Sequence, residues 1–448
     1  MYTYDIGIIG AGPCGISCAL STADKGKKVV IIECGNNFAT RYCAADAGKE
    51  CCSCQVCNVI SGFGGCVHYG DSAKLTFFPS GKELKKKLAN DYERIRDDAC
   101  DLWSVDSNTD FFSNEIKISQ HGFSVKEYPV CVLCSDDIKK KVSSWWEKLQ
   151  KQNVDYINDE MIDFEKKDNV FEVVLRNNKK VFCKKILLAM GRKGIGWFKD
   201  NISKKGINYM SPISSIGFRF EMPKEYLIEL GKLHPDFKAR TEYKGTKYKT
   251  FCFCAGIHGG RLKFANYGKY TLLDGHILTE SDTESKYANF ALLKQIKPSE
   301  KGNIDYYDAV NDILVEYQKI SKGSPIFQSY LDFKNMIERE PKSPISTSYV
   351  KNGPVYKLLK EGLNDYCDVA QEIFNYLANF NGILIDEMLS QVNVVGLELE
   401  GLWNKIITDE NFMTSMEGLY VGGDCGGETQ GILQATMMGI KIAEAIVM

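Results

Sequence analysis

The chain opens with a short apolar strand that runs directly into a glycine-rich turn. The strand covers residues 6–9, and Gly10, Gly12 and Gly15 then form a G-x-G-x-x-G motif. In such a motif the first glycine makes a tight turn, the second lets the backbone approach a pyrophosphate, and the third lets the next helix pack close to the strand. The phosphates would lie at the helix N-terminus, where unpaired N–H groups favour anions. This start predicts a dinucleotide-binding unit.

The residues that follow supply the context that this motif requires. Residues 16–25 suit a helix, and Gly26 suits its C-terminal end. Residues 29–32 form a second β-branched strand, which ends at Glu33. A carboxylate at this place is expected to accept hydrogen bonds from the ribose hydroxyls of an adenosine. A glycine turn without a ligand is therefore the less favoured interpretation.

Composition excludes several classes of protein. The 448 residues are enough for two or three domains, and the net charge of −2 gives no reason to expect nucleic acid or an anionic membrane as a partner. No secretory signal precedes the first strand, and no apolar run reaches membrane-spanning length, so a cytoplasmic location is the default expectation. The 17 cysteines are spread over a large chain, which suits a reducing compartment better than a secreted disulfide scaffold.

The order of predicted elements indicates an α/β fold: a discontinuous Rossmann-like domain with an inserted α+β domain. We assign residues 1–75, 130–203 and 386–448 to the dinucleotide-binding domain, 76–129 to a mainly helical insertion, and 204–385 to a substrate or cap domain. Helices are expected at 81–103, 136–152, 284–296, 305–321, 353–362, 367–380 and 432–447, and strands at 214–220 and 249–254. The cleft between the domains is the expected reaction site.

Three distant elements together resemble the two-dinucleotide-binding-domain flavoproteins of the glutathione-reductase type. They are the glycine turn with Glu33, an apolar strand ending at Met190 and Gly191, and a later strand followed by Gly423 and Asp424. The resemblance implies FAD as cofactor. It places the pyrophosphate at Gly10, Gly12, Pro13, Cys14 and Gly15, the ribose at Glu33, and the ribityl chain or a phosphate-side group at Asp424. Gln430, Gly431 and Ile432 would begin a helix that points at the flavin ring, where its dipole would stabilise reduced flavin.

More narrowly, the chain resembles the mostly uncharacterised bacterial and archaeal NAD(P)/FAD-dependent dehydrogenases. Four segments carry this resemblance: 58–65 with Asp71 and Lys74, 191–194 with Trp197, 216–223, and 250–254 with 423–431. The chain departs from the family at 70–74 and at Ala255 and Gly256. By this resemblance, Gly64, Gly65 and Lys74 would lie beside the isoalloxazine, with Lys74 near N1 and C2=O.

The family resemblance implies an FAD-dependent oxidoreductase. Hydride would pass between flavin N5 and a small or medium organic substrate, in the reduction of an activated C=C bond or the reverse dehydrogenation. No second G-x-G-x-x-G has its own strand and acidic residue, so NAD(P)H would bind only transiently, or a redox partner protein would exchange the electrons. A thiol/disulfide oxidoreductase and a non-catalytic electron-transfer flavoprotein are the alternatives.

Candidate catalytic residues are polar side chains near the expected flavin. His68, Lys74 and His258 are candidate general acids. Arg219, together with Arg192, is a candidate anchor for a substrate carboxylate. For His68 alone, packing or backbone hydrogen bonding is the more ordinary role.

A cysteine-dense loop has three open interpretations. Cys51, Cys52, Cys54 and Cys57 lie within seven residues. Cys51, Cys54 and Cys57 have spacing that suits a metal or iron–sulfur site, or a dithiol that exchanges electrons with the flavin, or an ordinary reduced loop. Cys252 and Cys254 would complete such a site if the inserted domain folds over the loop. In the alternative arrangement only one of the two cysteines would face the cleft.

Overall fold

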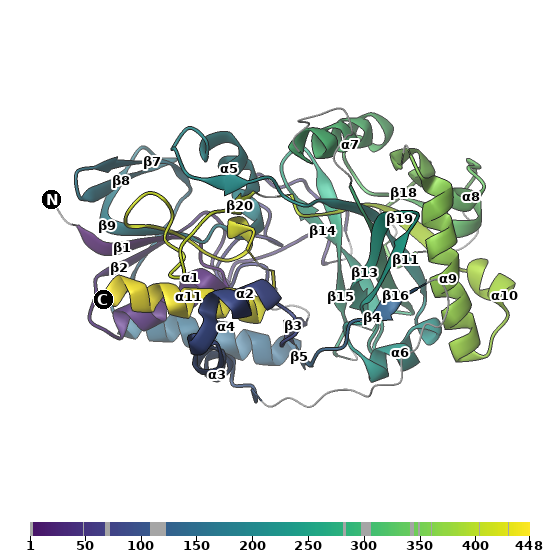
Figure 1. Cartoon of the computed structure of the whole chain (residues 1–448), viewed down its shortest axis with the longest axis horizontal. Helices are drawn as coiled ribbons and strands as arrows, with labels where there is room; N and C mark the ends of the chain where they lie inside the picture. Colours follow the sequence, from purple (N-terminus) through teal and green to yellow (C-terminus); the bar gives the residue numbers. More distant parts are fainter. Residues whose placement is uncertain are drawn as a thin grey trace.

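The computed structural model describes residues 3–47, 49–67, 72–107, 122–280, 284–296, 306–340, 345–347, 350–359, 361–402, 404–428 and 430–448. The chain forms two bodies that lie side by side, each built around its own sheet (Figure 1). Both termini belong to the first body. The protein is therefore an α/β chain in which a Rossmann-like body is joined to a second body. No helix in the described part of the chain is long and apolar enough to cross a membrane.

The first sheet has seven strands with a parallel core. Its order is β6-β2-β1-β9-β8-β7, and β21 also pairs with β9. The strands are β1 (Tyr4–Ile9), β2 (Val29–Glu33), β6 (Asp155–Asn158), β7 (Met161–Lys167), β8 (Val170–Leu175), β9 (Lys180–Leu188) and β21 (Leu419–Val421). The first half of β9 pairs antiparallel with β8, and its second half pairs parallel with β21. The central strands are apolar because both faces of the sheet are covered.

Helices from distant parts of the sequence pack against this sheet and against one another. They are α1 (Pro13–Ala23), α2 (Lys82–Leu88), α3 (Tyr92–Trp103), α4 (Ser135–Lys151), α5 (Ile195–Asn201) and α11 (Ile432–Val447). Helices α1, α3, α4 and α11 share one hydrophobic core. The helix expected at 81–103 is interrupted at Ala89, which has a positive φ of 46°. Its two parts belong to the first body, with Leu84 and Ile95 in that core.

The second body contains an eight-stranded, mostly antiparallel sheet in the order β18-β17-β19-β11-β16-β13-β12-β4. These strands are β4 (Ser124–Val125), β11 (Ser215–Pro223), β12 (Ala239–Tyr243), β13 (Thr246–Cys254), β16 (Tyr287–Gln295), β17 (Ile326–Ser329), β18 (Lys351–Asn352) and β19 (Asn393–Glu400). Its helices are α6 (Ile228–Leu233), α7 (Tyr306–Ser321), α8 (Tyr330–Lys334), α9 (Leu363–Asn381) and α10 (Ile385–Leu389). This sheet is not a second parallel dinucleotide-binding sheet.

Three strand pairs lie outside the two large sheets. They are β3 (Ala73–Thr76) with β5 (Val130–Leu133), β10 (Tyr209–Met210) with β20 (Lys405–Ile406), and β14 (Gly260–Asn266) with β15 (Thr271–Ile277). The β14–β15 hairpin and β3 bring side chains from both bodies to the same pocket.

Two predicted helices are wrong. Most of 284–296 is strand β16 (Tyr287–Gln295) at the centre of the second sheet, because burial on both sides overrides the helix propensity of its Ala, Leu, Lys and Gln residues. Where the structure describes residues 353–362, it has a short 3₁₀ turn, Val355–Leu358, which begins after Pro354. Strand β19 pairs with β11, so the second sheet extends beyond the expected boundary at residue 386.

Candidate functional site

A pocket of about 420 Å³ lies where the glycine turn of the first body faces the β13 and β15 strands of the second. This volume is in the range of small-molecule and cofactor sites. Of the predicted cofactor residues, the following line it: Gly10, Gly12, Pro13, Cys14, Glu33, Gly65, Lys74, Met190, Gly191, Gly423, Asp424, Gln430, Gly431 and Ile432. Gly15 and Gly64 do not. The sequence therefore located one wall of a real cavity.

The space around the Cα atom differs among the three glycines of the motif. A Cβ on Gly10 would overlap the carbonyl oxygen of Ala189, and Gly10 has a φ of +109°. A Cβ on Gly15 would overlap the carbonyl oxygen of Gly10, so Gly15 allows α1 to pack on its strand. Gly12 has an ordinary φ of −83°. A Cβ there would have only the Cα of Gly65 within 4 Å, at 3.8 Å. Packing inside the protein does not require glycine at 12, but the open space beside it suits a ligand at the N-terminus of α1.

The Glu33 carboxylate is buried and already has backbone partners. It accepts N–H hydrogen bonds from Ala11 at 2.7 Å, Gly35 at 2.8 Å and Gly62 at 2.9 Å. Glu33 thus ties the glycine turn to the loop after β2 and to the loop before Phe63. The sequence predicted a contact with ribose, and the structure adds a role in holding the pocket floor together.

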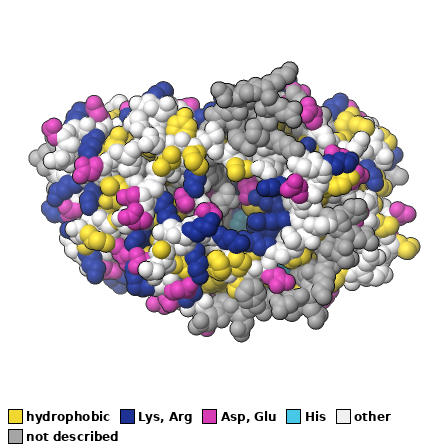
Figure 2. All heavy atoms as spheres, in the orientation of Figure 1, with side chains coloured by type: hydrophobic (Ala, Val, Ile, Leu, Met, Phe, Trp, Pro, Cys, Tyr) yellow, Lys and Arg dark blue, Asp and Glu magenta, His cyan; other side chains and the backbone are white. Residues whose placement is uncertain are grey.

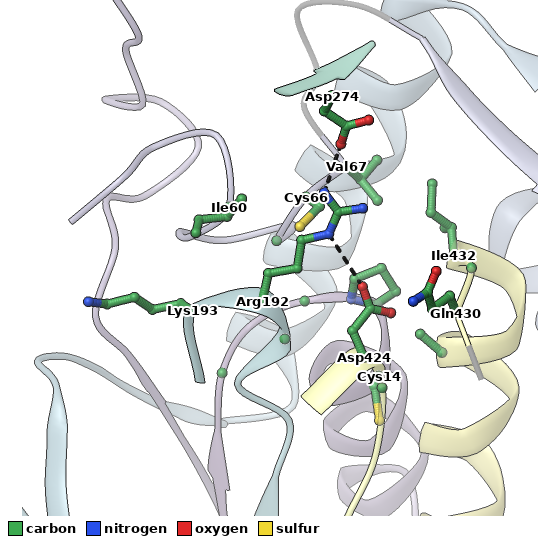
Figure 3. A pocket seen from close by; sticks show the side chains of 18 of the residues that line it. Cys14, Ile60, Cys66, Val67, Arg192, Lys193, Asp274, Asp424, Gln430 and Ile432 are labelled. Atoms are coloured by element: carbon green, nitrogen blue, oxygen red, sulfur yellow. Dashed lines mark hydrogen bonds and ion pairs between the residues drawn. The ribbon is translucent and has the colours of Figure 1, made fainter. Parts of the chain in front are cut away.

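An arginine bridges the two bodies across the pocket. Arg192 follows β9, and its Nη1 lies 2.8 Å from Asp274 Oδ2 on β15. Its Nε lies 3.7 Å from Asp424 Oδ2, which follows β21 (Figure 3). Burial acts to raise the pKa of Asp274, but the charges of Arg192 and Arg219 outweigh it and hold that pKa well below its usual range. Arg192 is therefore committed to two carboxylates at the back of the site.

Lys74 is a second link between the bodies. Its Nζ lies 3.1 Å from Asp236 Oδ1 and also donates to the carbonyl oxygen of Phe253. Burial acts to raise the pKa of Asp236, but Lys74 and Lys238 and a hydrogen bond from Tyr128 lower it to about 2. Lys74 lines the pocket as expected, with its ammonium group held by the second body.

Two other predicted catalytic residues, Arg219 and His258, do not line the pocket. Arg219 is completely buried, pairs with Glu398 at 2.7 Å and donates to Asn289 at 2.6 Å, so its guanidinium is held by protein groups rather than offered to a substrate. His258 lies in the turn between β13 and β14 and does not line the pocket. His68 and Asp71 fall outside the described residues. His276, which the sequence did not single out, lines the pocket.

The Cys51–Cys57 loop also lies outside the pocket lining. Cys57 is buried and accepts the Asn266 N–H at 3.4 Å, whereas Cys54 is exposed. Within the described ranges, no group of three or more His, Cys, Asp or Glu side chains is arranged to hold a metal ion. Cys252 and Cys254 are distant from this loop in sequence. Their two sulfurs lie 3.7 Å from each other.

A group of basic residues was not predicted from the sequence. Lys238, Arg240 and Lys249 line the pocket from β12, β13 and the loop before β12. Burial and the neighbouring charges of Lys238 and Arg240 lower the pKa of Lys126 to about 8. Lys249 pairs with Glu400, whereas Lys126, Lys238 and Arg240 form no ion pair with other described residues. Figure 2 shows Lys and Arg side chains gathered beside the hollow on this face. The second body thus gives the pocket a positive side.

Comparisons with known proteins find distant similarities. No protein-family model matches the chain. An uncharacterized protein of Clostridium beijerinckii is 23% identical over 462 aligned residues, covering 98% of this chain and 80% of that protein.

Three solved structures illustrate the structural similarities. The 2,6-dihydroxypyridine-3-hydroxylase of Arthrobacter nicotinovorans has a TM-score of 0.42 and 9% identity, covering 100% of this chain and 84% of that one. A flavoprotein/dehydrogenase of Cytophaga hutchinsonii has a TM-score of 0.40 and 12% identity, covering 100% and 78%. A geranylgeranyl bacteriochlorophyll reductase-like protein of Thermoplasma acidophilum has a TM-score of 0.38 and 13% identity, covering 100% and 78%. Scores of this size do not establish a shared fold.

Proposed function

We propose that the pocket binds FAD and that the chain is an FAD-dependent oxidoreductase. The observation that carries this proposal is the open space at Gly12, at the N-terminus of α1 and inside the pocket. A pyrophosphate there would meet unpaired backbone N–H groups and the positive end of the helix. Glu33, at the end of the neighbouring strand, lies where a carboxylate receives a ribose in dinucleotide-binding folds.

The remaining lining residues fit the rest of such a cofactor. Gly191, Gly423 and Gly431 all have positive φ values and line the pocket, so the backbone turns closely around it without side chains. Asp424 would hold the ribityl side, and the N-terminus of α11 at Ile432 would face the flavin ring. When bound, FAD would supply hydride exchange with an organic substrate. The family resemblance favours an activated C=C bond as the reacting group and NAD(P)H as a transient donor.

The second body supports a substrate class. Lys126, Lys238 and Arg240 lie at or beside the pocket and form no ion-pair contact with a described carboxylate, although the charge of Lys238 also acts on Asp236. Cations of this kind attract carboxylates or phosphates. We therefore propose a small organic anion as substrate, recognised by these residues rather than by the buried Arg219. All 17 cysteines are free thiols, which suits a reducing compartment such as the cytoplasm.

Reconstitution with FAD tests the cofactor. The purified protein should retain flavin absorbance after desalting. Gly12→Val should weaken FAD binding roughly tenfold or more, about 1.4 kcal/mol, because the side chain would fill the space for the pyrophosphate. Because Gly12 is the N-cap residue of α1, where valine is less favourable than glycine, the apo melting temperature of the variant is measured separately to distinguish lost stability from lost FAD binding. Gly196→Val is the matched control, since a Cβ on Gly196 meets nothing within 4 Å and Gly196 does not line the pocket.

Electron acceptors then test the activity. The bound flavin is reduced anaerobically with NADH, NADPH or light and mixed with enoates, quinones and disulfides. Reoxidation by one class of organic anion supports the enzyme proposal. A flavin inert to every small molecule would support the electron-transfer alternative, and a protein that stays colourless after reconstitution would overturn the proposal at its root.

A further inference from the structure

A β-bulge in β13 brings two cysteine sulfurs together. Phe251 pairs with Ala291 and Cys254 with Asn289, so β13 has an extra residue between these two pairs. Cys252 takes a positive φ of 46° at this place. In a regular strand Cys252 and Cys254 would share one face but lie about 6.6 Å apart along the strand, at ~3.3 Å per residue. At this bulge the two sulfurs lie only 3.7 Å apart.

The surroundings of this pair stabilise one negative charge. Arg219 Nη1 lies 4.0 Å from Cys254 Sγ, and the Lys74 ammonium contacts the carbonyl oxygen of the intervening Phe253. Burial acts to raise the pKa of Cys254, but a hydrogen bond with Cys252 and the charges of Lys74 and Arg219 outweigh it and lower that pKa. The same hydrogen bond, with burial, raises the pKa of Cys252. When the pair carries one negative charge, these surroundings favour it on Cys254 and leave the proton on Cys252.

The two sulfurs differ in access. Cys252 is half-buried and lines the pocket. Cys254 is completely buried and does not line it. A small molecule entering the pocket therefore meets Cys252 first, and Cys254 is placed to react with whatever forms on Cys252.

We propose that Cys252 and Cys254 are a redox-active dithiol that reduces small-molecule disulfides of the glutathione type. Cys252 attacks the disulfide R–S–S–R as its proton passes to the Cys254 thiolate, forms a Cys252–S–S–R bond and releases R–S⁻. Cys254 then loses its proton to that thiolate and attacks Cys252 Sγ, forming the Cys252–Cys254 bond and releasing the second R–S⁻. The pair is oxidised by two electrons, and the small disulfide is reduced to one thiol and one thiolate.

This reaction does not rest on FAD binding, because dithiol and disulfide exchange electrons directly. Closing the pair requires the sulfurs to move from 3.7 Å to about 2.05 Å. Rotation of the half-buried Cys252 side chain, beside the open pocket, can supply most of this movement.

Mass spectrometry of the native protein tests the proposal. The full-length protein is equilibrated anaerobically with mixtures of oxidised and reduced glutathione, quenched in acid and alkylated. Trypsin cleaves after Lys249 and Arg261, and the peptide 250–261 contains Cys252 and Cys254 and no other cysteine. As the proportion of oxidised glutathione rises, the doubly alkylated peptide should be replaced by an unalkylated peptide. The mass of that peptide should be two hydrogens below the mass of the reduced, unalkylated sequence. A peptide that stays doubly alkylated throughout would overturn the proposal, as would one joined only to other peptides.

Single variants test the order of attack. Cys254→Ser should accumulate glutathione on Cys252, because the resolving sulfur is gone. Cys252→Ser should accumulate none on Cys254, because that sulfur is inaccessible. Cys54→Ser, in an exposed loop, should behave like the parent. Equal labelling of Cys252 and Cys254 would contradict the assigned order. The measurement on the parent protein stands if a variant fails to fold.

The Gly12→Val protein separates this proposal from the proposed function. If that variant lacks FAD and still forms the 252–254 disulfide, the dithiol is real whatever the cofactor. If the parent binds FAD and never forms the disulfide, the dithiol proposal fails alone.

Discussion

At the scale of single residues, Glu33 joins fold and function in one carboxylate. Its Oε1 accepts the N–H groups of Gly35 and Gly62, and its Oε2 accepts that of Ala11. The side chain is only 5% exposed, so these backbone donors have few alternative partners. A residue expected to bind a ligand is therefore also needed to close the glycine turn before any ligand arrives.

Glu33→Gln should destabilise the protein even without FAD. One carboxylate oxygen becomes an NH₂ group that faces a backbone N–H donor, and leaving a buried donor unpaired costs about 1–3 kcal/mol. Urea unfolding of the apo protein, followed by circular dichroism, measures the difference. Glu147→Gln on the exposed side of α4 is the control and should change stability little. Unchanged apo stability in Glu33→Gln would mean that the carboxylate serves only the ligand.

The residues predicted correctly as lining the pocket share one property: their placement is local. Gly10, Gly12 and Glu33 follow from a strand, a turn and a helix that are adjacent in sequence. Asp274, Asp236 and Lys238 could not be predicted, because the second body brings them to the pocket from about 200 residues away. Distant contacts also explain why the prediction for Arg219 as a substrate anchor was wrong. Its guanidinium pairs with Glu398 and donates to Asn289, and neither neighbour could be predicted from the local sequence.

At the scale of elements, the contact between α1 and α11 holds the pocket floor in place. Gly439 of α11 lies directly against α1, where an added Cβ would overlap Cys14 O and Ser17 Oγ. Ser17 Oγ also donates to Thr436 O at 3.0 Å, so the two helices are bonded as well as packed. Since the N-terminus of α1 lines the pocket, its position depends on this contact.

Gly439→Ala should destabilise the protein although alanine favours a helix. Alanine gains about 1 kcal/mol of helix propensity over glycine, but overpacking against backbone costs about 1–3 kcal/mol and moves α1. Gly196→Ala in α5 is the matched control: with no neighbour within 4 Å, it should stabilise the protein by up to about 1 kcal/mol. Thermal melts of the two variants should shift in opposite directions, and a gain in both would show that the α1–α11 contact can relax.

Burial on both sides did not by itself prevent correct prediction, because β1, β2 and β11 were expected as strands whereas β16 was not. Helix α11 has the bounds expected from the sequence, 432–447. Strand β16 was mistaken for a helix because its run from Tyr287 to Gln295 lacks a strand's alternation, as expected between two other strands. The bulge at Cys252 has no sequence signal, since a positive φ at a non-glycine residue depends on the partner strand.

At the scale of the whole molecule, the charge of the chain and the charge of its pocket differ. The net charge is −2, and it gave no reason to expect an anionic partner. The fold nevertheless gathers Lys126, Lys238 and Arg240 on the second body's side of the cavity, opposite the glycine turn. A positive pocket in a slightly acidic protein attracts small anions locally without attracting extended polyanions.

The sign of the electrostatic potential in this pocket can be measured with oxidants of opposite charge. With FAD loaded and photoreduced, anionic ferricyanide should reoxidise the flavin faster at low salt than at high salt, and a cationic ferrocenium salt should show the reverse.

Lys238→Gln with Arg240→Gln should slow ferricyanide roughly tenfold at low salt and flatten its salt dependence, because two cations beside the entrance are gone. Ferrocenium should become faster in the same variant. Lys140→Gln with Lys204→Gln removes the same charge from exposed sites away from the pocket, so it should leave both oxidants near their parent rates. Equal changes in the two double variants would trace the effect to net charge and contradict recognition of an anion by the second body.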